Sequence, residues 1–442
     1  MNWGNPGMLK FSVCTFGCRC NQADSAALRE GLCRRAMSEG DNHRDSDIVI
    51  VNTCTVTHRT DQQVRQAIRR LHRENPAASV IVTGCYAERD PEALAAIPGV
   101  TLVVGNAEKD RLPEILEQSG LHSQGKIIRA PLEGDRDYLL PPMTHTGGKT
   151  RPLVKLQDGC DARCSYCIVP HVRGPGRSAR TQDVLAEMRN LVKAGFQEIV
   201  LTGIHLGAFG RKAKGQAHLI DLLREITGIP NLGRIRLSSI EPMLLERAII
   251  NLAAANPVIA NHFHVPVQSG SDRILRRMRR PYTAARVREL FRFIEAAIPD
   301  VGLGTDILVG FPGETDEDFS ETCELIQASP LTYLHVFPFS PREGTEAYLM
   351  SGRIPSKVMK ERLGILLEIS RSKNLAFRRK FIGRVLPAIT LSKEEGLGMS
   401  IVLTGNYIHV RIPGLALPPN HLLNIRIDEV HPTSASGSPV GV

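Results

Sequence analysis

Short apolar runs alternate with helical patterns along most of this chain of 442 residues. Between Leu9 and Leu116 the alternation predicts four strands with helical segments between them. These strands are 9–14, 47–51, 79–82 and 101–104. Such alternation is typical of a parallel sheet with helices on its faces. It constrains function as well as fold, because ligand sites in such sheets lie outside the carboxyl ends of the strands.

Three cysteines follow three of these predicted strands. They are Cys18 in FGCRCNQADS, Cys54 in VNTCTVT and Cys85 in VTGCYAER. Since the carboxyl ends of parallel strands meet at one edge, we expect the three thiols to gather into one metal site. Buried cysteines are often merely small apolar residues, but each of these three follows a polar or glycine turn. Cys20 lies two residues from Cys18 and could compete as a ligand.

A longer alternation resumes after Arg151 and predicts six strand–helix units. The strands are 153–157, 198–202, 234–238, 262–267, 304–309 and 333–337. Six units predict a partial (β/α)6 TIM-like barrel, in which catalytic groups gather at the carboxyl ends of the strands.

Three further cysteines follow the first barrel strand, in DGCDARCSYC. Cys160, Cys164 and Cys167 have the spacing C-x3-C-x2-C, which can hold three irons of a cubane cluster and leave the fourth iron open to a cofactor. This spacing is a signature of radical S-adenosylmethionine (SAM) enzymes. A structural zinc site needs four ligands, for which His171 is the nearest candidate. A disulfide would leave one of the three thiols unpaired.

Polar and glycine residues follow the other barrel strands. Asp306 and Ser239 could hydrogen-bond to the ribose or methionine groups of SAM, and glycine lets a ligand approach the backbone. A plain loop or capping role remains the alternative. The candidate SAM-binding residues are Tyr166, Gly203, Ser239, Gln268 and Asp306. Arg173 and Arg177, beside the cysteine loop, suit a carboxylate or phosphate and are candidate substrate-binding residues.

From about Phe377 the chain predicts short strands separated by glycine turns. They are 385–391, 400–404, 406–412 and 422–427. Roughly sixty residues of this kind suggest a small all-β barrel of OB-like size. Such a barrel suits RNA binding through shape and stacking, although a dimerisation module would have the same pattern. The tail PTSASGSPVGV is predicted to be disordered.

The composition favours a reduced-thiol protein with a polyanionic partner. The net charge is +9, and the ten cysteines are spread along the chain rather than packed into a secreted framework. No apolar run approaches the ~20 residues that span a bilayer, and MNWGNPGMLK contains no apolar signal region. We therefore expect a cytoplasmic protein that does not bind a membrane.

The three N-terminal motifs and DGCDARCSYCIVPHVRGPGRS together resemble those of the radical SAM methylthiotransferases. The resemblance covers residues 9 to 430. NTCTVT, LTGIHLGAFG, RLSSIEP and HVFPFSPREGT look like the branch that acts on N6-threonylcarbamoyladenosine in tRNA. The implied organisation is an N-terminal methylthiotransferase domain (8–125), a linker (126–150), a radical SAM domain (151–375), a TRAM domain (377–432) and a disordered tail (433–442).

The resemblance implies SAM and two [4Fe–4S] clusters as cofactors. The cluster at Cys160, Cys164 and Cys167 would cleave SAM to methionine and a 5′-deoxyadenosyl radical, which abstracts hydrogen from the substrate. An auxiliary cluster at Cys18, Cys54 and Cys85 would supply or carry sulfur. The implied product is the 2-methylthio derivative of the nucleoside at position 37 of tRNA. We expect a monomer that takes electrons from a donor such as flavodoxin or ferredoxin.

Two alternatives stay open at this point. The first is a methylthiotransferase that acts on isopentenyladenosine in tRNA or on a ribosomal protein. The second is a zinc-stabilised RNA-binding protein without enzymatic activity, which would contain zinc and leave SAM intact.

Overall fold

The computed structural model describes residues 8–119, 125–132, 138, 140, 150–211, 217–391 and 398–441. The chain divides into two compact units, and each is described here by itself. The first comprises Met1–Gly147, Asp158–Ser178 and Ser340–Thr345. The second comprises Gly148–Gln157, Ala179–Phe339 and Glu346–Val442.

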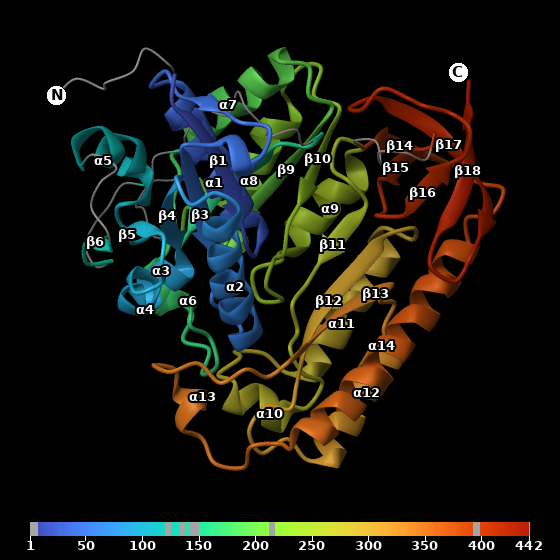
Figure 1. Ribbon diagram of the computed structural model, residues 1–442. Coiled ribbons are helices and arrows are strands. Elements are labelled where there is room, and N and C mark those ends of the chain that lie inside the picture. Colours follow the sequence, from blue (N-terminus) through green and yellow to red (C-terminus); the bar gives the residue numbers. More distant parts are fainter. Residues whose placement is uncertain are drawn as a thin grey trace. The chain divides into compact units, whose positions relative to one another are not determined.

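A parallel sheet of six strands forms the centre of the first unit (Figure 1). In the order β2-β1-β3-β4-β5-β6, the strands are Ser38–Glu39, Lys10–Thr15, Ile48–Thr53, Ser79–Gly84, Val100–Val104 and Lys126–Ile128. The four predicted strands are confirmed, and the two short edge strands β2 and β6 are additional. Because β6 pairs with β5, the prediction that the linker begins at residue 126 is wrong. Most of the remaining predicted linker lies outside the described residues.

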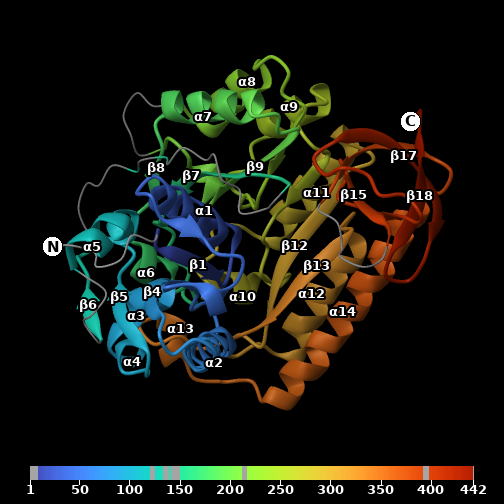
Figure 2. The ribbon, with the colours of Figure 1, turned by 45° about the horizontal axis from the view of Figure 1, so that its top comes forward.

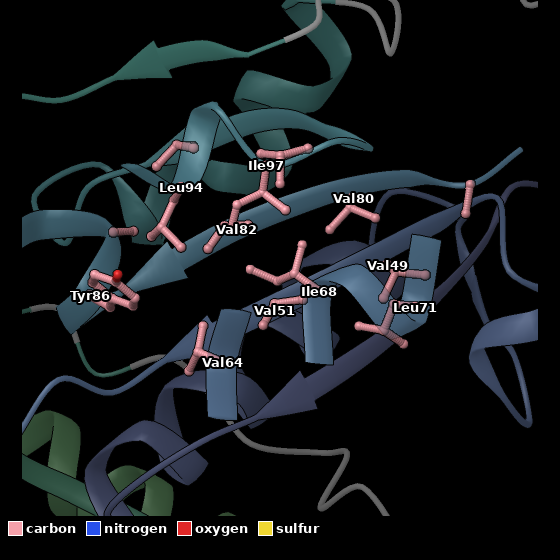
Figure 3. Packing of buried hydrophobic residues seen from close by; sticks show 14 residues of the cluster. Val49, Val51, Val64, Ile68, Leu71, Val80, Val82, Tyr86, Leu94 and Ile97 are labelled. Atoms are coloured by element: carbon pink, nitrogen blue, oxygen red, sulfur yellow. The ribbon is translucent and has the colours of Figure 1, made fainter. Parts of the chain in front are cut away.

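Helices cover the faces of this sheet. They are α1 (Arg19–Cys33), α2 (His58–Glu74), α3 (Cys85–Arg89), α4 (Pro91–Ala95) and α5 (Leu112–Ser119), with short 3-10 turns η1 (His43–Asp45) and η2 (Lys109–Arg111). The unit also contains α6 (Val169–Arg173), which packs against α3, and strand β8 (Arg177–Ser178). Figure 3 shows Val64, Ile68 and Leu71 of α2 turned towards valines of β3 and β4. Their spacing places the three side chains on one helix face. Helices on both sides explain why β3 and β4 are buried along their whole length.

Six parallel strands follow one another along the second unit, as predicted. They are β7 (Leu153–Asp158), β9 (Glu198–Gly203), β10 (Arg234–Leu237), β11 (His262–His264), β12 (Gly302–Val309) and β13 (Tyr333–Pro338). Figure 2 shows two of them, β12 and β13, side by side. Among the described residues a single isolated bridge, Ile235 to Ile259, links β10 to the segment before β11, so the six strands divide into two sheets at this point. Strand β11 is shorter than predicted and ends two residues before Pro266, which cannot donate a ladder hydrogen bond.

The helices of the second unit alternate with these strands along the chain, and the last two follow β13. They are α7 (Thr181–Lys193), η3 (Leu206–Ala208), α8 (Leu219–Thr227), α9 (Arg247–Ala255), α10 (Asp272–Arg277), α11 (Ala284–Ala297), α12 (Asp316–Ala328), α13 (Glu346–Leu349) and α14 (Ser356–Arg379). Helix α12 begins with the predicted capping box, since Thr315 and Asp318 exchange hydrogen bonds between side chain and backbone. No helix among the described residues is long and apolar enough to cross a membrane.

A closed five-stranded barrel ends the second unit (Figure 1). In the order β14-β15-β16-β18-β17, its strands are Val385–Thr390, Ser400–Thr404, His409–Ile412, Ala435–Val440 and Leu422–Val430. The predicted small all-β barrel is therefore confirmed. The predicted disorder of the tail is wrong for Ala435–Val440, because β18 pairs with both β16 and β17. Backbone pairing on two sides orders a segment that carries few apolar side chains.

A buried ionic cluster joins this barrel to β10. Glu198 is fully buried and accepts hydrogen bonds from Arg234 and Arg236 at 2.7 and 3.0 Å. Burial alone would raise the pKa of Glu198, but the two guanidinium groups hold it at about 2. Arg236 also donates to the carbonyls of Thr404 and Gly405 in the C-terminal barrel, each at 3.0 Å. Each arginine thus binds both halves of the unit.

Candidate active site: two cysteine triads and a buried arginine

The first cysteine triad lies at the carboxyl edge of the N-terminal sheet. Cys18 is the N-cap of α1, Cys54 directly follows β3, and Cys85 begins α3 directly after β4. The backbone of Gly17 passes close to Cys54: a Cβ added to this glycine would lie 2.8 Å from the Cys54 sulfur. The φ angle of Gly17 is +100°, which favours glycine. The local chain thus allows the Cys18 loop to approach the Cys54 thiol.

The three thiols influence one another electrostatically. Burial first, and then Cys85 and Cys18, raise the pKa of Cys54 to about 12. A hydrogen bond with Cys20 holds the pKa of Cys18 at about 6. Neighbouring thiolates repel one another, and a metal ligand must be deprotonated, so a cationic centre among the three thiols would remove the conflict. The donor set therefore fits an iron–sulfur cluster with three thiolate ligands.

Arg173, the last residue of α6, connects this triad to the second cysteine motif. Its side chain is 1% exposed, and its Nε lies 3.3 Å from the sulfur of Cys85. The guanidinium donates to Asp158 at 2.7 Å and to Asp24 at 3.0 Å, and also to the side-chain oxygen of Asn21. Asp158 immediately precedes the Cys160 loop. Burial and saturation with partners favour a positioning role for Arg173 over the substrate contact predicted from sequence.

The second triad occupies the loop that follows β7. Cys160 N–H donates to the carbonyl of Gly174 at 3.0 Å, and Cys167 N–H donates to that of Cys164 at 3.1 Å. Gly159 has a φ angle of +71°, and an added Cβ would lie 2.0 Å from the carbonyl oxygen of Pro175. Only glycine allows this approach. Ala162 N–H donates to the Cys160 sulfur at 3.4 Å. All three thiols are partly exposed, as a cluster that must meet a cofactor requires.

The other predicted site residues occupy different parts of the two units. Tyr166 and Arg177 lie in the segment of the second triad, where Arg177 is 3.9 Å from the carboxylate of Asp158. Gly203 ends β9, Ser239 follows β10, and Gln268 follows β11. Their contacts with SAM, and those of Tyr166 and Asp306, stay a prediction, as does substrate binding by Arg177.

Gln268 has an unusual backbone. Its φ angle is +73°, a left-handed conformation that a residue with a side chain adopts at a cost. Hydrogen bonds hold it there: Gln268 N–H donates to Asp306 O at 2.8 Å, and Leu308 N–H donates to Gln268 O at 2.9 Å. Strain of this kind clusters at ligand sites, so the conformation supports the candidate role of Gln268.

The sequence patterns did not indicate that Arg342, near the first triad, is buried. Arg342 pairs with Asp61 of α2 and donates to the hydroxyl of Thr55 at 3.1 Å, next to Cys54. It stands more than 280 residues from both partners. Charged residues in a loop ordinarily predict solvent exposure, and no local pattern signals such a partner. The structure thus adds Arg342 to the groups that anchor the first triad.

Replacing Arg173 with glutamine is expected to destabilise the first unit by about 3 kcal/mol, because it removes the buried cation that Asp24 and Asp158 share. Asp24 keeps its ion pair with Lys109 at 2.6 Å, whereas Arg177 lies 3.9 Å from Asp158. Urea unfolding of the apo-protein measures the change. The control is Arg180→Gln, since Arg180 is 75% exposed and its ion pair with Asp183 lies at the surface; its cost should stay below about 1 kcal/mol. Equal stability of the two variants would contradict the positioning role.

Family models match both parts of the chain that carry cysteine motifs. The model described as "Radical SAM superfamily" matches residues 154–326. The model described as "Uncharacterized protein family UPF0004" matches residues 10–105. The radical SAM match contains Cys160, Cys164 and Cys167, and the UPF0004 match contains Cys18, Cys54 and Cys85.

Relatives of the chain match almost its whole length. It is 36% identical over 406 residues to the threonylcarbamoyladenosine tRNA methylthiotransferase MtaB of Aquifex aeolicus, which covers 92% of this chain and 97% of the relative. It is 32% identical to the tRNA-2-methylthio-N(6)-dimethylallyladenosine synthase of Bacillus licheniformis, over 98% of this chain and 86% of the relative. The two relatives are named for different nucleosides and differ little in identity.

Solved structures support the fold. The radical S-adenosylmethionine methyltransferase TsrM from Kitasatospora setae matches with a TM-score of 0.56 and 18% identity, covering 75% of this chain and 73% of that one. The relatives and both family models agree with the chemistry inferred from the two cysteine triads, and the zinc-protein alternative loses its support. The chain belongs to the family of radical S-adenosylmethionine methylthiotransferases.

Proposed function

We propose that this protein methylthiolates N6-threonylcarbamoyladenosine at position 37 of tRNA. The observation that carries the reaction type is the presence of two cysteine triads in one compact unit, connected by Arg173. The name of the Aquifex relative, matched over 97% of its length, supports the nucleoside. The dimethylallyladenosine relative, at 32% identity, makes isopentenyladenosine the second candidate.

Membership of the radical SAM superfamily implies a [4Fe–4S] cluster and SAM as cofactors. Cys160, Cys164 and Cys167 would hold this cluster, and Cys18, Cys54 and Cys85 would hold the proposed second one. When bound, the first of these clusters would supply the electron that cleaves SAM, and the second would supply or carry the sulfur.

The chain's own residues position these groups. The N–H of Ala162 stabilises negative charge on the Cys160 sulfur, and the guanidinium of Arg173 does the same at Cys85. The ion pair of Arg173 with Asp158 fixes the start of the second cysteine loop relative to the first triad. A flavodoxin or ferredoxin as electron donor, a monomeric state and a cytoplasmic location stay predictions.

Exposed basic side chains support a polyanionic substrate such as tRNA. Helix α2 presents Arg59, Arg69 and Arg73 to solvent in the first unit. In the second unit, Arg379 and Lys380 are exposed at the end of α14, before the C-terminal barrel. Such side chains suit phosphate contacts, which position a nucleic acid without reading its sequence. The basic run RRMRR (276–280), at and beyond the end of α10, is weaker support, because Arg280 is buried against Glu241.

The nucleosides of tRNA test the assignment. In a strain that lacks the gene, we expect the methylthio form of N6-threonylcarbamoyladenosine to disappear and its unmethylthiolated precursor to accumulate. Mass spectrometry of digested tRNA measures both, and a plasmid copy of the gene should restore the product. Loss of the methylthio-isopentenyl nucleoside instead would assign the protein to the sibling branch. Unchanged tRNA nucleosides would refute a tRNA substrate.

A further inference from the structure

Two histidines and an aspartate gather on one face of the strands β11, β12 and β13. Asp306 of β12 is directly paired with His335 of β13 in the ladder, so their side chains point to the same face. His264 of β11 is paired with Gly304, two residues before Asp306, and thus also lies on that face. Figure 1 shows these three strands side by side, as their ladder pairing requires.

The donor atoms of the three side chains have the separations of ligands around one ion. Asp306 Oδ1 lies 3.1 Å from His264 Nε2 and 3.2 Å from His335 Nδ1. All three donor atoms lie within 4.8 Å of one another. Metal–ligand bonds of about 2.0–2.2 Å place neighbouring ligands about 3.0–3.5 Å apart. The arrangement therefore needs little movement to accept an ion.

The buried histidine is oriented towards Asp306. His264 is 7% exposed, and its Nε2 faces the carboxylate of Asp306 at 3.1 Å. Its other ring nitrogen lies 2.8 Å from the hydroxyl of Ser239. A hydrogen bond that fixes the far nitrogen of the ring is the usual support of a metal-binding histidine.

Neighbouring groups shape the surroundings. The ring of Tyr333 fills the space above Gly304, where an added Cβ would lie 2.1 Å from the ring. This ring lies 5.9 Å from that of His264 and 5.3 Å from that of His335. The His335 side chain is 54% exposed, against 22% for Asp306. An ion can therefore reach the three side chains from solvent. Its coordination positions on the side of His335 stay open to water or another oxygen donor.

We propose that His264, Asp306 and His335 form a binding site for a divalent first-row transition metal ion, separate from the six cysteines of the two triads. Two imidazoles with one carboxylate and open positions suit Fe²⁺, Mn²⁺ or Zn²⁺ and are a poor match for the oxygen-rich sites of Mg²⁺ and Ca²⁺. The site does not depend on which nucleoside the enzyme modifies. It also places Asp306 in a role other than the SAM contact predicted from sequence.

Manganese binding to the cluster-loaded enzyme tests the site. Mn²⁺ is the suitable probe, because carboxylate and imidazole bind it better than thiolate does. Titration followed by electron paramagnetic resonance should show one Mn²⁺ per chain, with nitrogen couplings from imidazole. His335→Ala and Asp306→Asn should each weaken binding roughly tenfold or more.

A matched histidine provides the control. His431 is 53% exposed, nearly the same as His335, and its Nε2 lies 3.4 Å from the carboxylate of Glu429. The variant His431→Ala should bind Mn²⁺ like the wild-type enzyme. If the wild-type enzyme binds no stoichiometric Mn²⁺, or if His335→Ala binds it as well as His431→Ala does, the proposal is overturned. The two histidines and Asp306 then form an ion pair and not a metal site.

Discussion

The variant Cys54→Ala is expected to retain SAM cleavage and to lose sulfur insertion, at least about a thousandfold, because residues that act as a unit fail together when one is removed. Cys54 is buried directly after β3, and its pKa responds to both Cys85 and Cys18. Removing its sulfur leaves two thiols, too few to hold the proposed auxiliary cluster firmly. The other triad is untouched, so its chemistry should continue.

Two measurements on the same reconstituted sample distinguish SAM cleavage from sulfur insertion. The amount of 5′-deoxyadenosine reports SAM cleavage, and the methylthio nucleoside in tRNA reports sulfur insertion. Iron should fall from about eight to about four per chain, as the loss of one four-iron cluster requires. The control is Cys14→Ala, since Cys14 lies on β1 and packs against the core of the same unit. Full sulfur insertion by Cys54→Ala would refute a role for the first triad.

The variant Cys164→Ala is expected to lose both SAM cleavage and sulfur insertion, each at least about a thousandfold, since radical formation precedes every later step. Cys164 lies at the centre of the C-x3-C-x2-C loop, and its carbonyl accepts the hydrogen bond from Cys167 N–H. Alanine keeps this backbone contact and removes only the sulfur. The loop should therefore fold normally while holding its cluster poorly.

The iron content distinguishes loss of a cluster from loss of folding. Cys164→Ala should still contain about four irons per chain, held by the first triad. Its control is Cys323→Ala, because Cys323 lies on α12 of the second unit and outside both triads. Substantial 5′-deoxyadenosine formation by Cys164→Ala would exclude the second triad as the site of SAM cleavage.

Local patterns predicted the elements of both units well, because each element has its own periodicity. Strands β3 and β4 are continuous apolar runs with turns after them, so the placement of Cys54 and Cys85 at one sheet edge followed from topology alone. The capping box of α12 is likewise a local pattern, because its two residues, Thr315 and Asp318, stand three positions apart. The strand β18 escaped prediction, because small polar residues give no apolar alternation and its order comes from pairing with β16 and β17.

The sequence by itself determined the two cysteine triads, the six-strand partial barrel and the family, since motif spacing and strand order are local properties. Tertiary structure decided how the charged groups are used. Arg173 is predicted from sequence to contact a substrate, and only the structure shows that its side chain is buried between Asp24 and Asp158. The site of His264, Asp306 and His335 depends on the register of three strands. Register and long-range ion pairs leave no periodic trace in sequence, because the partners stand far apart along the chain.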